Sequence, residues 1–516
     1  MKASTLWASA LCVLGGLSSV VSGKKVHTFP KPPGVKAVDH PNPTGGYVNG
    51  TFEQPLDHND PSKGTFSNRF WFNAQWWKGP GSPVFLFMPG ESDASLYLGY
   101  LDNGTVPGLY AEVFGGLVIV IEHRYWGESS PFDTLTAETL QYLDLPQAMM
   151  DITYFAKNVS FDLGNNLGTN DNSDNAPWVL VGGSYPGALT AWINQKEPGV
   201  FYAYHASSAV VETITDFYTY FSPVEEALPA NCSADVRAVV QYVDHVLVNG
   251  NAADVQELKN GFGLGYLNHN NDFAVQVSYP LRQWQEDEAY VQDFCDYLET
   301  TGETHIVLTN PNGVGLATAL PLYQKFINAT RGAACSAGNG TACNTHVNEE
   351  EFNDPTDFTD MRQWDWLCCH NPFGWWQVGP NVTDGTNIIS QFADINFYER
   401  QCPLTFPTVN GYSSGLAAGF TPEHLDLYTG GWNGDFNKVI FVNGEVDPWR
   451  SATVSSDYRP GGRKASTDAA PIFVVPAGNH CPELLLEEFE GAPDLYKDIF
   501  EIMRTWLSEW KAPSKN

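Results

Sequence analysis

Short, nearly continuous apolar runs recur along the first half of the chain, at Pro83–Met88, Leu117–Ile121 and Trp178–Val181. Runs of this length are typical of strands that are buried on both faces of a parallel sheet. Between the second and third runs, apolar residues recur every three or four positions from Gln147 to Asn158, which predicts an amphipathic helix. The order strand, helix, strand predicts a right-handed crossover unit.

Two more runs of the same kind lie near the C-terminus, at Val439–Val442 and Pro471–Val475. The long stretch between the two sets of strands lacks such runs and holds seven of the eight cysteines that follow Cys12. We therefore predict one α/β domain that is interrupted by a large, mainly helical cap inserted before the last strands. The expected boundaries are 45–206 for the first part of the domain, 207–425 for the cap and 426–516 for the second part.

The N-terminus has a different pattern. Residues 1–23 contain an apolar stretch behind Lys2 and end in small residues, which is typical of a secretory signal peptide. Residues 24–44 are rich in proline and glycine and indicate a leader or a removable pro-segment. No later window has the length and apolarity of a membrane span, so we expect no membrane partner. The expected location is extracellular, with a vacuolar or lysosome-like compartment as the alternative.

The chain of 516 residues is strongly acidic, with 59 Asp and Glu residues against 27 Lys and Arg residues and a formal net charge of −32. Such a charge argues against nucleic acid as a partner. Two interpretations of the acidity stay open. It keeps the protein soluble, or it adapts the protein to an acidic medium, where many carboxylates are protonated and repel one another less.

Two features of the sequence are typical of secreted proteins. The cysteines after the signal peptide favour disulfide bonds, because the neighbours Cys368 and Cys369 lack the C-x-x-C or histidine spacing of a metal site. The chain also carries seven N-x-S/T sequons, which predict glycosylation. They lie at Asn49, Asn103, Asn158, Asn231, Asn328, Asn339 and Asn381.

The segment Val179–Leu189, VLVGGSYPGAL, places a serine between an expected strand and an expected helix. Strand, sharp turn and helix are what a nucleophile elbow needs, because the turn lifts the Ser184 hydroxyl above the sheet. The spacing departs from G-x-S-x-G, since Pro186 stands where the second glycine is usual. We expect Pro186 in the first helical turn, where its missing N–H costs nothing. On local evidence, Ser184 is either a nucleophile or a polar residue in a glycine-rich turn.

A serine nucleophile needs a base and an acid that orients the base, and the chain order Ser, Asp, His is that of α/β-hydrolases. Asp447 follows the run at Val439–Val442, and His480 follows the run at Pro471–Val475. Both therefore lie one loop beyond a strand end, where such folds assemble their sites. His123 is the rival base, but its neighbours favour a structural charge cluster, and Glu445 is the alternative acid.

Several motifs in this order resemble the acid prolyl peptidase family, which contains lysosomal prolyl carboxypeptidase, dipeptidyl peptidase II and the fungal secreted prolyl endoprotease, the last being the most similar. The motifs are FEQPLDH from Phe52, EHRYWGESSP from Glu122, GGSYPG from Gly182, NGEVDPW from Asn443 and GNH from Gly478. The resemblance covers residues 45–510 and implies an α/β-hydrolase fold. It implies cleavage of peptide bonds after proline, and also after alanine, with no metal or cofactor.

The resemblance also implies roles for individual residues. Ser184 matches the nucleophile, Asp447 the acid and His480 the base. The N–H of Tyr185 and the loop Gly90-Glu91 are the expected oxyanion donors. Glu91 has a second interpretation, which is to bind the amino end of a substrate. Trp375 and Trp376 are candidates for a proline pocket, with packing inside the cap as the equal alternative.

Three classes of function stay open from the sequence. The first is a peptidase for proline-containing peptides and proteins, acting internally in acid or, alternatively, at a chain end. The second is another α/β-hydrolase chemistry, such as an esterase. The third is a binding protein without catalysis, which the filled triad positions disfavour. No oligomeric state is predicted.

Overall fold

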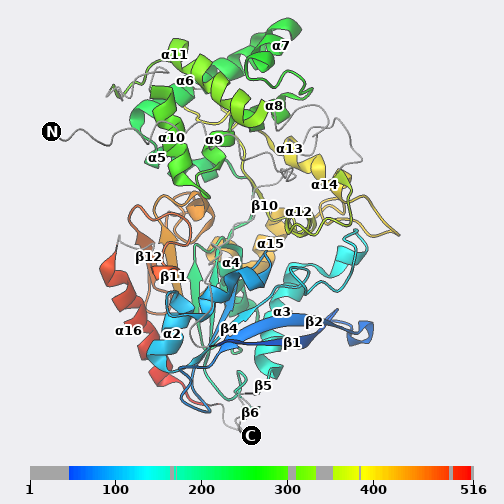
Figure 1. The fold of residues 1–516 in the computed structure, drawn as a ribbon, viewed down its shortest axis with the longest axis vertical. Coiled ribbons are helices and arrows are strands. Elements are labelled where there is room, and N and C mark those ends of the chain that lie inside the picture. The colour runs from blue at the N-terminus through cyan, green and yellow to red at the C-terminus, as the bar shows by residue number, and fades with distance from the viewer. Residues whose placement is uncertain are drawn as a thin grey trace, which may run out of the picture. The chain divides into compact units, whose positions relative to one another are not determined.

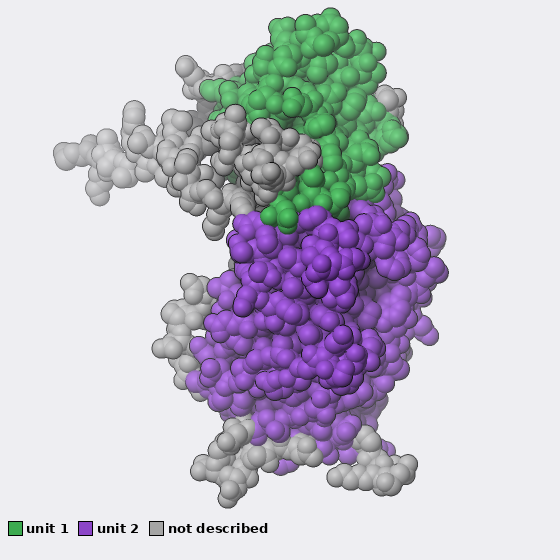
Figure 2. All heavy atoms as spheres, turned by 90° about the vertical axis from the view of Figure 1, so that its right-hand side faces the viewer, with its two compact units in different colours: residues 1–28, 228–353, 378–404 green, residues 29–227, 354–377, 405–516 purple. Residues whose placement is uncertain are grey.

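A computed structural model of the chain describes residues 46–162, 168–169, 171–299, 310–332, 352–382, 385–486 and 492–512. The expected signal peptide at 1–23, the expected leader at 24–44 and the sequon at Asn339 lie outside these residues. The described residues form two compact units (Figure 2), with unit 1 taking those from 228–353 and 378–404 and unit 2 taking those from 46–227, 354–377 and 405–512. The outer parts of the expected cap region, 207–227 and 405–425, belong to unit 2.

Unit 2 is built on an eight-stranded sheet with the strand order β1-β2-β4-β3-β7-β8-β11-β12. The first two pairings, β1 with β2 and β2 with β4, are antiparallel, and the others are parallel. This mixed sheet confirms the predicted α/β-hydrolase fold. The strands are β1 Val48–Pro55, β2 Thr65–Asn73, β3 Val84–Met88, β4 Leu117–Ile121, β7 Trp178–Gly183, β8 Ala203–Ser207, β11 Val439–Gly444 and β12 Ile472–Val475.

Five of these strands are the five predicted apolar runs. Strands β3, β4, β7 and β11 are buried along their whole length, which explains their lack of polar alternation. Strand β8 was not predicted, because its sequence AYHAS contains a histidine and no aliphatic run, yet every residue of it is buried.

Helices cover both faces of the sheet (Figure 1). Side chains of α2 and α16 pack with residues of β3, β4, β7 and β11 in one hydrophobic core. Helix α3 confirms the predicted helix and begins two residues earlier, since Asp144 accepts a hydrogen bond from the N–H of Gln147 and caps it. The helices of unit 2 are α2 Val106–Phe114, α3 Leu145–Asn158, α4 Ser184–Lys196, α5 Phe221–Ala227, α12 Met361–His370, α15 Pro422–Thr429 and α16 Pro493–Glu509.

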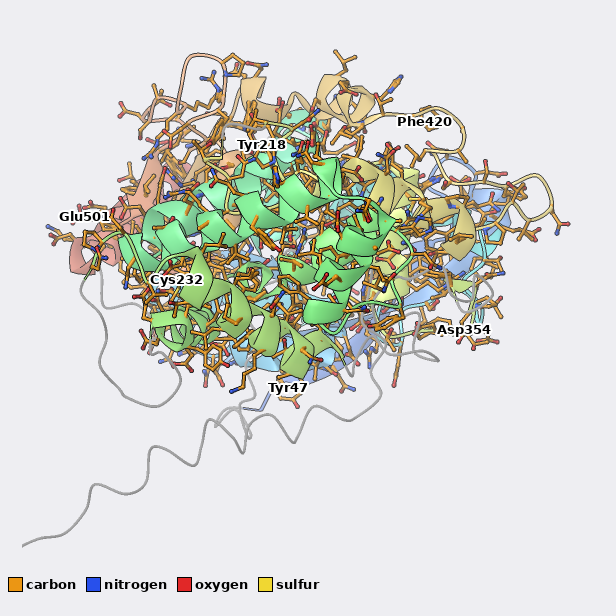
Figure 3. All side chains as sticks on the ribbon, turned by 90° about the horizontal axis from the view of Figure 1, so that it is seen from above. Tyr47, Tyr218, Cys232, Asp354, Phe420 and Glu501 are labelled. Atoms are coloured by element: carbon orange, nitrogen blue, oxygen red, sulfur yellow. A yellow bond between two sulfur atoms is a disulfide. The ribbon has the colours of Figure 1, made fainter. Side chains whose placement is uncertain are left out.

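Unit 1 consists mainly of helices. A disulfide between Cys232 and Cys295 joins α6 to α10, and Cys232 is labelled in Figure 3. The helices are α6 Ala230–Asn249, α7 Ala252–Gly261, α8 Asn270–Val277, α9 Tyr279–Arg282, α10 Glu288–Glu299, α11 Leu316–Ile327, α13 Ile395–Glu399 and α14 Gln401–Thr405, whose last residue belongs to unit 2. The remaining short strands, which all belong to unit 2, are β5 Phe161–Asp162, β6 Gly168–Thr169, β9 Ile214–Asp216 and β10 Gly374–Trp376.

The prediction of disulfide bonds is confirmed for some of the cysteines that the structure describes. Cys369 and Cys402 are disulfide-bonded, whereas Cys368 and Cys481 are buried free thiols. Cys368 and Cys369 are consecutive on α12, so their side chains point about 100° apart around the helix and cannot both face one partner.

The predicted glycosylation sites differ in exposure. The side chain of Asn231 is half-buried on α6. The other five sequons that the structure describes have exposed asparagines, which leaves room for a glycan. They are Asn49, Asn103, Asn158, Asn328 and Asn381.

Candidate active site

Ser184 stands on a sharp turn between β7 and α4. Its φ of +64° lies in the left-handed region, which costs a non-glycine residue about 1–2 kcal/mol and is a feature of strained functional turns. The turn is close to its neighbours, because a Cβ added at Gly182 would lie 2.3 Å from the carbonyl oxygen of Pro186. A Cβ at Gly187 would lie 2.7 Å from the carbonyl oxygen of Ser207 on β8. Both glycines are therefore required by close packing.

Pro186 occupies the first turn of α4, which begins at Ser184, and this confirms its predicted place. Backbone N–H groups in the first turn, including that of Tyr185, have no partner within the helix. Gly90 follows β3 with a φ of +89°, and a Cβ there would lie 2.4 Å from Cγ of Pro186. The structure thus brings the Gly90-Glu91 loop against the elbow, next to Tyr185.

A chain of two hydrogen bonds links Ser184, His480 and Asp447. The Oγ of Ser184 lies 2.6 Å from Nε2 of His480, and Nδ1 of His480 lies 2.9 Å from Oδ1 of Asp447. Ser184 and Asp447 are fully buried, and the side chain of His480 is 4% exposed. These distances are within hydrogen-bond range for a nucleophile, a base and an orienting acid.

The loops after β11 and β12 hold the acid and the histidine together. The N–H of Val446 donates to the carbonyl oxygen of Gly478, 3.0 Å away, and the N–H of Trp449 donates to Oδ1 of Asp447, 2.9 Å away. Glu445, the alternative acid, instead accepts a hydrogen bond from the N–H of Ala477. Of the two candidate acids, Asp447 is therefore the one in contact with His480.

His123, the rival base, has a structural environment. It is buried, with Nε2 3.1 Å from the hydroxyl of Tyr185 and Nδ1 2.9 Å from the carbonyl oxygen of Arg124. Burial lowers the pKa of His123 to about 4, so the ring is neutral. Its neighbour Arg124 pairs with Asp151 at 2.6 Å, which confirms the predicted charge cluster.

Burial and charge act on two ionisable groups of the site. Burial alone would lower the pKa of His480, but the negative charge of Asp447 outweighs it and holds the pKa well above its ordinary value. Burial raises the pKa of Glu91 well above its ordinary value, and this side chain is 4% exposed. Neither carboxyl oxygen of Glu91 has a hydrogen bond to another residue in the part of the chain that the structure describes.

Aromatic side chains pack beside His480. Trp375 is buried, stacks on Phe373 at 4.7 Å and donates its Nε1–H to the carbonyl oxygen of Glu212. Its ring meets Trp449 edge to face at 6.0 Å, and the ring of Trp449 lies 6.4 Å from that of His480. The place of Trp449 beside His480 was not predicted, although Trp449 is the last residue of the motif NGEVDPW. Trp376, also on β10, is 1% exposed.

The side chains and helices of the described residues bear on metal binding and on membrane insertion. Within these residues, no group of three or more His, Cys, Asp and Glu side chains is arranged to hold a metal ion. None of the helices in the described ranges is long and apolar enough to cross a membrane.

The mixed sheet, the strained serine and its hydrogen-bonded histidine and aspartate are features of a serine hydrolase with the α/β-hydrolase fold. The family model of serine carboxypeptidase S28 matches residues 54–495. The chain therefore belongs to the S28 family of serine peptidases, and the predicted family is confirmed at this level.

Relatives from fungi agree with this assignment. Serine protease vicPb from Bipolaris victoriae is 34% identical over 96% of this chain and 92% of its own length. Serine protease vicPa from the same organism is 35% identical over 89% of this chain and 87% of its own length. A "Probable extracellular serine carboxypeptidase" from Arthroderma benhamiae is 28% identical over 83% of this chain and 62% of its own length.

Proposed function

We propose that this peptidase hydrolyses peptide bonds on the carboxyl side of proline, with Ser184 as nucleophile, His480 as base and Asp447 as the acid that orients it. The observation that carries the proposal is the chain of two hydrogen bonds, 2.6 Å and 2.9 Å long, at the tip of the strained elbow. Alanine is the expected secondary residue on the amino side of the cleaved bond.

In the proposed reaction, His480 takes the proton of Ser184 as Oγ attacks the carbonyl carbon of the proline residue. The oxyanion of the tetrahedral intermediate accepts hydrogen bonds from the N–H of Tyr185 and from the Gly90-Glu91 loop. His480 then gives its proton to the leaving amine, and an acyl-enzyme remains. Water, deprotonated by His480, attacks the acyl carbonyl carbon, and His480 returns that proton to Oγ of Ser184 as the acyl group leaves, while Asp447 stabilises the imidazolium in both steps.

Aromatic faces suit a proline ring, which is compact, apolar and without an N–H. We assign this recognition to Trp375 and Trp376, with Trp449 between Trp375 and His480. The ring of Trp449 lies 6.0 Å from that of Trp375 and 6.4 Å from that of His480. These distances support the assignment, because they connect the proposed proline pocket to the proposed base. The burial of Trp375 and its stacking on Phe373 equally suit a packing role.

Internal cleavage is the preferred mode, and an exopeptidase is the second candidate because of Glu91. A buried carboxylate beside the proposed base could pair with the ammonium group of a substrate's free amino end. Its raised pKa argues against this pairing, because a neutral carboxyl attracts a cation weakly. We therefore assign Glu91 to the oxyanion loop.

Acid has opposite effects on the activity of the proposed base and on the stability of the fold. The raised pKa of His480 means that the base is protonated, and inactive, in acid. Burial raises the pKa of Glu212 to about 7 and that of Asp426 to about 6, which favours the folded state in acid. Glu212 and Asp426 therefore support the proposed acidic working pH, whereas His480 opposes it.

Secretion and glycosylation belong to the same proposal. The exposed asparagines of five sequons and the disulfide between Cys232 and Cys295 support passage through the secretory pathway. The name of the Arthroderma benhamiae relative, which includes the word extracellular, is in line with this.

The test compares three substrates at mildly acidic and neutral pH: an N-blocked peptide ending in a Pro-chromophore, a free Xaa-Pro-chromophore and a peptide ending in Pro-Xaa. Internal cleavage predicts turnover of the blocked substrate, whereas preference for either of the others indicates an exopeptidase. Hydrolysis of simple esters alone would contradict the proposal. Ser184→Ala should abolish turnover with an unchanged near-UV spectrum.

A further inference from the structure

The loop that carries His480 is fastened to strand β8 by a buried carboxylate. Glu483 lies three residues after His480 and is fully buried. Its Oε1 lies 2.9 Å from Nε2 of His205, and its Oε2 accepts a hydrogen bond from Oγ of Ser207, also 2.9 Å away. His205 and Ser207 both belong to β8, and both are fully buried.

Two tyrosines complete this cluster. The hydroxyl of Tyr110 lies 2.9 Å from Nδ1 of His205, and the hydroxyl of Tyr496 donates to the backbone carbonyl of Glu483, 2.9 Å away. A buried carboxylate without partners is costly, so it is retained where its hydrogen bonds are made. Both oxygens of Glu483 have partners, yet the proposed reaction uses none of these groups.

The place of β8 in the sheet gives the cluster its significance. Strand β8 lies between β7, which leads to Ser184, and β11, which leads to Asp447. Ser207 stands opposite Gly183 on one side and opposite Val442 on the other. An anchor at Ser207 therefore fixes the histidine loop relative to both of the other strands.

A second contact fastens the same loop to Ser208, the residue that follows β8. The N–H of Cys481, directly after His480, donates to Oγ of Ser208 at 2.9 Å. A backbone contact at Cys481 and side-chain contacts at Glu483 thus hold the loop at both ends of the short segment Cys481–Glu483. Together they restrict where the imidazole of His480 can stand.

We propose that Glu483 is a positioning residue, which acts through Ser207 and His205 to set the imidazole of His480 against Oγ of Ser184. The inference rests on the proposed roles of Ser184 and His480. Displacing a reacting group by about 1 Å can cost about a hundredfold in rate. Loss of the anchor should therefore lower kcat while KM stays unchanged.

The experiment measures kcat and KM on the blocked Pro-chromophore substrate for three variants, at a temperature where each is folded by near-UV circular dichroism. Glu483→Ala removes both side-chain bonds and should lower kcat about tenfold or more. Glu483→Gln keeps an oxygen for His205 and a donor for Ser207 and should restore most of kcat. Tyr110→Phe, the control, removes a hydroxyl from the cluster without touching Glu483 and should leave kcat within about twofold of wild type.

A wild-type kcat for folded Glu483→Ala would overturn the inference, as would an equal loss of kcat in Tyr110→Phe. If Glu483→Ala does not fold, Ser207→Ala, which removes one hydroxyl, takes its place. It should lower kcat without raising KM, and an unchanged kcat would refute the anchor. Ser184→Ala separates the two proposals, since full activity of that variant would contradict the triad itself.

Discussion

Gly90→Ala tests whether the loop after β3 forms part of the oxyanion site. Alanine at a φ of +89° costs about 1–2 kcal/mol of backbone strain. The new Cβ would also lie 2.4 Å from Cγ and 2.9 Å from Cδ of Pro186. Carbon atoms rest about 3.5 Å or more apart, so the loop and the elbow must separate by about 1 Å.

Such a separation moves an oxyanion donor out of reach, and the loss of one donor costs about 10²–10³ in kcat. We therefore expect Gly90→Ala to lower kcat about a hundredfold with little change in KM. It should also weaken inhibition by a peptide boronic acid, which mimics the tetrahedral intermediate, by a similar factor.

Gly81→Ala is the matched control. Gly81 has a φ of +84°, but a Cβ there would meet only the carbonyl oxygen of Asn175, 4.0 Å away. This variant should lose similar stability and keep kcat within about twofold, because strain alone does not displace the loop. Equal kcat values for the Gly90 and Gly81 variants would refute the assignment of the Gly90-Glu91 loop to the oxyanion site.

Two further predictions concern stability. Burial raises the pKa of Glu212 to about 7, so its folded form keeps a proton that the unfolded chain loses, and stability falls as pH rises from about 4.5 to about 7. Glu212→Gln should therefore gain about 1 kcal/mol over wild type above neutral pH, after solvent screening, and a pH-independent melting difference would contradict this. Opening the 63-residue loop in Cys232→Ser/Cys295→Ser should cost unit 1 about 4 kcal/mol, seen as an earlier calorimetric transition. An unchanged thermogram would show that the disulfide adds nothing.

The sequence predicted the parts of the fold that depend on continuous burial. Strands β3, β4, β7 and β11 are apolar throughout because both of their faces are covered. Strand β8 was not predicted because His205 and Ser207 make its sequence appear polar. The burial of these two residues depends on Glu483, which lies 276 residues away from Ser207. No local pattern could predict a strand whose polar groups find their partner so far along the chain.

The candidate site follows the same division. Ser184, Asp447 and His480 were each predicted from a strand end, and the structure brings the three side chains together. The contact between Gly90 and Pro186 could not be predicted, because it depends on how two loops meet. Trp449 could have been found from its place two residues after Asp447, since loop residues beside an acid of the site are natural contacts for the base.

The most direct test of the central claim is to label the active protein with a fluorophosphonate, which phosphonylates an activated serine, and to locate the label by peptide mass spectrometry. We predict one modified residue, Ser184, with loss of proline cleavage in proportion to labelling. His480→Ala should remain folded and resist the reagent, because the base no longer activates Oγ. A label on another serine, or full turnover after Ser184 is modified, would contradict the account.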